Sequence, residues 1–146
     1  MRAFAWYSLA VLRRAIGVRS RRRHHFVAAE WCYGRALGLV EKHIAARLGR
    51  GLLRWRELDD WAGAIHDFST LLALHPTQHL ALFYRGMAYY RGGNYHAAAH
   101  DLASFIQAAP ESPWVHHATI QLEGMNAILD DLPKLLPPPG PRLLED

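Results

Sequence analysis

The chain has 146 residues, of which 51% are apolar and 21% are charged, so it has the composition of a folded protein and not of a disordered one. Its length predicts a single domain, and its single cysteine, Cys32, excludes both an internal disulfide and a zinc site built from several cysteines. The net charge of +4 is distributed unevenly, because residues 1–29 contain seven arginines and no acidic residue. The rest of the chain is mildly acidic, so the two parts need separate explanations.

Residues 1–28 are interpreted as a basic and apolar N-terminal arm. The apolar run from Ala3 to Leu12 is about half of the roughly 20 residues that a membrane-spanning helix needs. Arg13 and Arg14 follow this run, where a secretory signal would have a small-residue cleavage site. We therefore expect a cytoplasmic protein, with membrane or organelle association through the arm as an alternative.

Three interpretations of the arm remain open from the sequence. It is a helix that lies on a membrane surface, an arginine-rich transit sequence, or an end helix packed on the body of the protein. For the first of these, clustered positive charge predicts contact with an anionic surface. The residues predicted to make that contact are Arg13, Arg14, Arg19, Arg21, Arg22 and Arg23.

An internal repeat follows the arm and a predicted helix at residues 26–43. Shifting the sequence by 34 residues aligns side chains of similar size and polarity, and this period is typical of a helix-turn-helix solenoid. In the second unit we predict helices at residues 80–91 and 95–108, with a turn between them that tolerates positive φ. The aligned pairs are Leu53 with Met87, Trp55 with Tyr89, Trp61 with Tyr95, Ala64 with Ala98, Asp67 with Asp101, Phe68 with Leu102, Leu71 with Phe105, Leu72 with Ile106 and Pro76 with Pro110.

Residues 45–112 resemble two tetratricopeptide repeats, at 45–78 and 79–112. The first unit departs from the family pattern at two positions, because Leu52 stands where the second unit has Gly86 and Asp59 stands where it has Gly93. The resemblance implies an all-α fold. The positions of the second unit that match the family are Gly86, Tyr89, Gly93, Tyr95, Ala98 and Pro110.

Two repeats are too few to bury a continuous core, so the flanking segments must complete it. We expect one helical domain at residues 29–131, in which a capping helix at 113–131 closes the array. The N-terminal helical extension precedes this domain. The proline-rich tail at residues 132–146 is expected to be extended or disordered.

Chemistry at a catalytic or metal site is not predicted. His96 and His100 lie one helical turn apart and form a weak candidate pair for a metal ion, but no third ligand is fixed by spacing. The aspartate pairs occur where turns and helix ends are expected, without a partnered nucleophile. We therefore expect neither enzymatic activity nor a cofactor.

The resemblance implies that the first helix of each repeat lines a concave groove in which another protein binds. We expect an adaptor or assembly subunit that holds a helix or extended segment of its partner, and homo-oligomerisation is a further possibility. Two alternatives remain: the protein's own arm or closing helix fills the groove, or the arginine cluster binds nucleic acid. The expected groove residues are Leu80, Phe83, Tyr84, Met87, Tyr90, Arg91, Arg50, Leu53 and Arg56.

Overall fold

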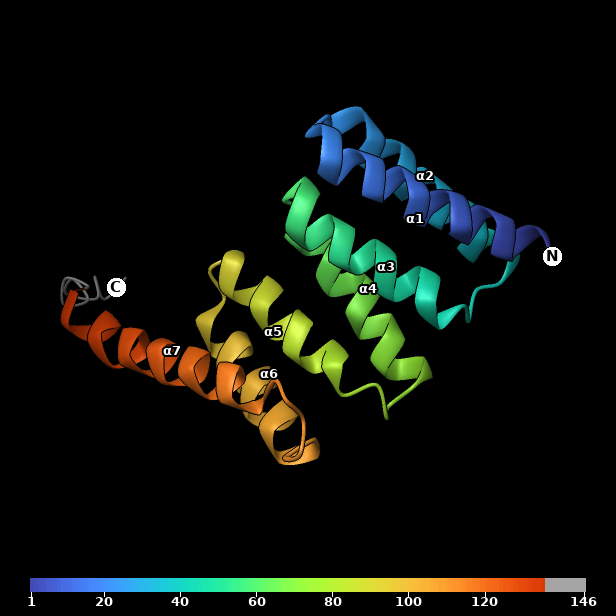
Figure 1. Cartoon of the computed structure of the whole chain (residues 1–146). Helices are drawn as coiled ribbons and strands as arrows, with labels where there is room; N and C mark the ends of the chain where they lie inside the picture. The colour runs from blue at the N-terminus through green and yellow to red at the C-terminus, as the bar shows by residue number, and fades with distance from the viewer. Residues whose placement is uncertain (136–146) are drawn as a thin grey trace, which may run out of the picture.

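The computed structural model describes residues 1–135, and within this range the chain is entirely α-helical apart from its turns and one short π-helix, as the sequence predicts (Figure 1). Helices follow one another in pairs joined by tight turns, and each helix packs mainly on its neighbours in sequence. The elements are α1 (Arg2–Ser20), α2 (Arg23–Leu39), α3 (Ile44–Leu53), η1 (Arg54–Leu58), α4 (Trp61–Leu74), α5 (Leu80–Arg91), α6 (Tyr95–Ala108) and α7 (Val115–Leu135).

The two predicted helices of the second repeat are confirmed at their predicted bounds, as α5 and α6. The turns within the two repeats are built in the same way. Asp59 and Gly93 both adopt left-handed backbone conformations, with φ of 55° and 81°. The next residue caps the following helix in each case, because the side chains of Asp60 and Asn94 accept hydrogen bonds from backbone N–H groups three residues later.

The alignment of the two repeats differs between their first and second helices. Arg50 pairs with Asp67, and Arg85 pairs with Asp101, so the aspartates are 34 residues apart but the arginines are 35 apart. The glycines at the helix crossings agree: a β-carbon on Gly51 would lie 2.7 Å from the Phe68 ring, and one on Gly86 would lie 3.2 Å from Leu102.

The sequence alignment of the first helices is therefore wrong by one residue. Gly51, and not Leu52, is the counterpart of Gly86. The pairings of Leu53 with Met87 and of Trp55 with Tyr89 shift accordingly.

The π-helix η1 contains the extra residue. The N–H of Asp60 donates to the carbonyl of Arg54, six residues back, whereas the N–H of Asn94 donates to the carbonyl of Tyr89, five residues back. A π-helical turn holds one residue more than an α-helical turn, so η1 restores the common alignment before the turn at Asp59.

The N-terminal arm is an integral part of the helical array. Ala3, Ala10 and Gly17 recur every seven residues along the buried side of α1, and the close approach at Gly17 brings Phe26 of α2 against it. The predicted domain boundary at residues 28 and 29 falls inside α2, and the helix predicted at 26–43 begins and ends earlier. Of the three interpretations of the arm, the structure shows an end helix packed on the body.

The closing helix α7 covers the other end of the array with the buried Ala118 and Met125. It continues to Leu135 and contains Pro133, so the predicted start of an extended tail at residue 132 is wrong. The rest of that tail lies outside the described residues. No helix within residues 1–135 is both long and apolar enough to cross a membrane.

Candidate functional site

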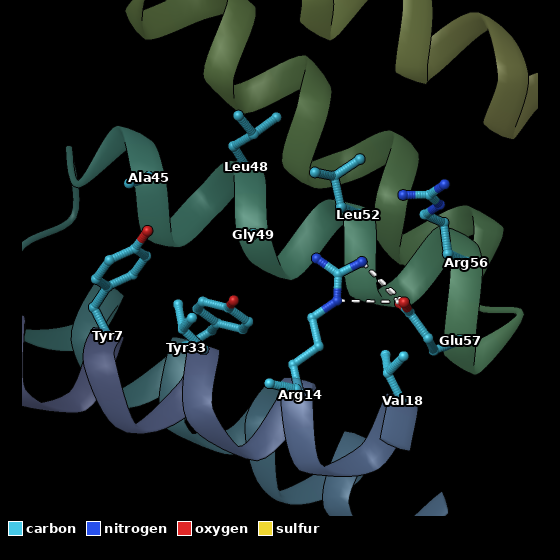
Figure 2. Close-up of a pocket in the computed structure, with 12 residues that line it drawn as sticks. Tyr7, Arg14, Val18, Tyr33, Ala45, Leu48, Gly49, Leu52, Arg56 and Glu57 are labelled. Atoms are coloured by element: carbon cyan, nitrogen blue, oxygen red, sulfur yellow. Dashed lines mark hydrogen bonds and ion pairs between the residues drawn. The ribbon is translucent and has the colours of Figure 1, made fainter. Parts of the chain in front are cut away.

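An open hollow of about 900 Å³ lies between α1 and α3, the first helices of two consecutive pairs (Figure 2). Its wall is mainly apolar, and its charged groups come from α1 and η1. We call this hollow the α1–α3 groove. Its lining residues are Tyr7, Val11, Arg14, Ala15, Val18, Tyr33, Ala45, Leu48, Gly49, Leu52, Arg56 and Glu57.

The groove opens because α2 separates the two helices that line it. α2 packs on both α1 and α3, whereas α1 makes few contacts with α3. Tyr33 of α2 lies at the base of the groove, against Gly49, where a β-carbon would be only 2.8 Å from the tyrosine ring. Burial raises the pKa of the Tyr33 hydroxyl, so it is a neutral hydrogen-bonding group at neutral pH.

One ion pair spans the groove from α1 to η1. The guanidinium of Arg14 donates to both carboxylate oxygens of Glu57, with nitrogen–oxygen distances of 2.9 and 3.2 Å (Figure 2). Both side chains are mostly buried, at 21% and 15% exposed. This two-point contact fixes the separation of α1 and η1 at this end of the groove.

Arg56 supplies a free positive charge beside that ion pair. Its side chain is exposed, and its guanidinium lies 5.6 Å from the centre of the Trp55 ring. No carboxylate within residues 1–133 forms an ion pair with Arg56, so the groove has an uncompensated cation at its η1 end.

The residues predicted to line a groove along α5 are placed differently. Leu53 and Phe83 are buried in the core, and Arg50 is bound to Asp67. Phe83 is covered by Trp114 and His117, whose rings lie 5.7 Å from it, so the closing segment covers this part of the stripe.

The other predicted groove residues divide into two groups. Tyr84, Met87 and Tyr90 are half-buried, while Leu80 and Arg91 are exposed at the two ends of α5. Of all nine predicted residues, Arg56 alone lines the α1–α3 groove.

The missed groove residues had a signal in the sequence. Tyr7, Val11, Ala15 and Val18 recur on one face of a helix, but this face was assigned to a separate arm. The groove became visible only once α1 was placed beside α3.

The predicted anionic-surface arginines are exposed with one exception. Arg13 and Arg19 lie on α1, and 21–23 form the turn and the start of α2. Arg14 is bound to Glu57 across the groove, so its assignment to the surface set is corrected.

The histidine pair remains a weak candidate. His96 and His100 are exposed on α6, and the His100 imidazole lies 3.8 Å from the Asp101 carboxylate. Within the described part of the chain, no group of three or more metal-ligating side chains is found.

Comparisons with known proteins agree with this geometry. A family model described as tetratricopeptide repeat matches residues 69–123. No curated protein matches the sequence.

Three of the similar solved structures cover most of the chain. The first repeat domain of Spaghetti (RPAP3), bound to an HSP90 peptide, has 19% identity, a TM-score of 0.67, and coverage of 85% of this chain and 95% of that one. The second domain of human RPAP3, in complex with an HSP70 peptide, has 15% identity, a TM-score of 0.68, and coverage of 85% and 98%. The Arabidopsis OM64 domain has 16% identity, a TM-score of 0.70, and coverage of 84% and 95%.

The shared fold extends well beyond residues 45–112 and takes in most of the described array. Together with the match over 69–123, it identifies the chain as a tetratricopeptide repeat protein.

Proposed function

We propose that this protein is a non-catalytic adaptor or assembly subunit that binds a segment of another protein in the α1–α3 groove. The observation that carries the proposal is an open, mainly apolar groove whose only polar wall is the Arg14–Glu57 pair with Arg56 beside it. Most ligand sites have this form, with an apolar lining and a few charged groups that fix orientation. The peptides bound to the similar RPAP3 domains support a peptide segment as the type of ligand.

The groove favours a segment with both apolar and acidic side chains. Val11 and Ala15 on one wall face Leu48 and Leu52 on the other, and this wall suits one or two apolar side chains. Arg56 is placed to pair with a carboxylate of the same segment. The lysine and asparagine set with which some family members hold a C-terminal carboxylate is absent, so we do not propose that activity.

The binding test uses peptides selected from a random library on the folded protein, with affinities measured by calorimetry. Ala15→Arg places a large charged side chain in the groove and is expected to weaken binding at least about tenfold. Ser8→Arg is the matched control, because Ser8 is exposed on the same helix outside the groove. Equal affinity of both variants for every selected peptide would refute the groove assignment.

The exposed arginines at the α1–α2 turn belong to the same proposal. In it, Arg13, Arg19 and 21–23 contact an anionic surface, which positions the groove close to that surface. Nucleic acid is the alternative surface, and it is favoured by the same charge cluster.

A further inference from the structure

The outer side of α1 carries an uncovered apolar strip. Ala5, Ser8, Leu12 and Ile16 recur at helical spacing and are exposed, on the side of the helix opposite to the buried glycine and alanines. Leu12 is 55% exposed and Ile16 is 38% exposed, and the adjacent Phe4 is 66% exposed. None of these side chains lines the α1–α3 groove, so α1 has two separate functional candidate faces.

The surroundings of this strip are positively charged. Arg13 lies at its edge, Arg19 follows it one turn later, and 21–23 continue directly from the end of the helix. Residues 1–29 contain no acidic residue. The nearest acidic side chains are engaged elsewhere, because Glu30 binds Arg54 and Glu57 binds Arg14.

We infer that the anionic surface is a lipid bilayer, and that α1 lies along it with Phe4, Leu12 and Ile16 at the level of the acyl chains. The arginines then reach the headgroups, as basic residues beside an interfacial helix do. This inference rests on the anionic-surface part of the proposed function and not on the groove.

The two other occupants of this face fit the observations less well. A second copy of the chain would bring its own arginines against Arg13 and Arg19, and like charges across an interface oppose association. Nucleic acid would use the arginines through phosphate contacts but would leave Leu12 and Ile16 without a role.

The test measures co-sedimentation of the full chain with two kinds of vesicle. One contains phosphatidylcholine and phosphatidylglycerol in equal parts, and the other contains phosphatidylcholine alone. The expected result is binding to the anionic vesicles only, weakened by added salt. Failure to bind the anionic vesicles would overturn the inference.

Two pairs of variants separate the apolar from the charged contribution. Leu12→Gln with Ile16→Gln is expected to lower vesicle affinity at least about tenfold, whereas Ile120→Gln with Ile128→Gln, at exposed positions of α7, leaves it unchanged.

Arg22→Gln with Arg23→Gln is likewise expected to cost about tenfold or more, and Lys42→Gln with Arg91→Gln is the charge-matched control. Circular dichroism of each variant verifies that the helices are intact.

Two further results would overturn the bilayer inference. Unchanged binding after Leu12→Gln with Ile16→Gln would mean that α1 is not seated in the bilayer. Binding to a DNA or RNA duplex without binding to vesicles would assign the arginines to nucleic acid. In that case the anionic-surface and groove proposals would both stand, because the peptide assay with Ala15→Arg is independent of the vesicles.

Discussion

At the scale of single residues, Asp67 is the most constrained polar group in the described array. It is fully buried and accepts hydrogen bonds from Arg50 and Arg54, at 2.6 to 3.1 Å, while Arg47 lies 3.7 Å away. Its counterpart in the next repeat, Asp101, has a single arginine partner, Arg85. That hydrogen bond raises the pKa of Arg85, so the pair stays charged.

This difference predicts unequal costs for the same substitution. Asp67→Asn leaves three largely buried guanidinium groups without their shared carboxylate, and we expect the free energy of unfolding to fall by about 3 kcal/mol or more. Asp101→Asn affects one arginine and is expected to cost about 1 to 2 kcal/mol. Urea denaturation of both variants measures the difference, and equal costs would contradict the account.

The sequence showed that Asp67 and Asp101 are equivalent, but it placed them on a solvated helix surface. Their burial could not be predicted from local spacing, because the arginines that neutralise them lie 16 or 17 residues earlier on a different helix. The same reason explains why Arg50 was assigned to the groove.

At the scale of helices, the π-helix η1 is the feature that distinguishes the two repeats. It inserts one residue between the core positions of α3 and the turn at Asp59, and it lies at the wall of the groove. Arg56 and Glu57 both belong to it, so the insertion and the charged groups of the groove coincide.

Deletion of Arg56 is therefore expected to convert η1 into ordinary α-helix. Gly51 and Leu53 would keep their packing and Asp59 would keep its turn, so we expect the free energy of unfolding to change by less than about 1 kcal/mol. Deletion of Arg91 from α5, which has no extra residue, is the control and is expected to cost more than about 2 kcal/mol. Chemical denaturation compares them, and a similar cost for both deletions would contradict this assignment.

Helix existence was predictable for both repeats, since turn and cap residues agree with the apolar pattern. The position of the inserted residue was not, because no side chain in 54–58 marks a π-helix by itself. The alignment depended on contacts between helices, which appear only after folding.

At the scale of the whole molecule, α1 and α2 complete the core that two repeats cannot form alone. Ala29, Cys32 and Tyr33 on α2 are buried in a cluster that also includes Ala10 of α1. Burial raises the pKa of the Cys32 thiol, consistent with its place in that core.

Removal of residues 1–20 is expected to destabilise the entire first helix pair. It would expose the apolar side of α2, so we expect the cooperative thermal transition to shift downward by roughly 5 °C or more, or to be lost with aggregation. Far-UV circular dichroism during heating measures this. Leu12→Gln with Ile16→Gln, which leaves the buried side of α1 intact, is expected to keep the transition, and an unchanged transition after truncation would contradict an integral role for α1.

The repeat offset also sets a rule for exchanging modules between such proteins. A chimera that replaces α3 by α5 with both cuts 34 residues apart would turn the grafted helix by one residue, about a quarter of a turn, against its partner. Arg85 would then miss Asp67, and a larger side chain would meet Phe68 where Gly51 now lies. The donor segment must be cut 35 residues downstream at its start and 34 at the following turn, so the helices of this protein are interchangeable only with their inserted residue taken into account.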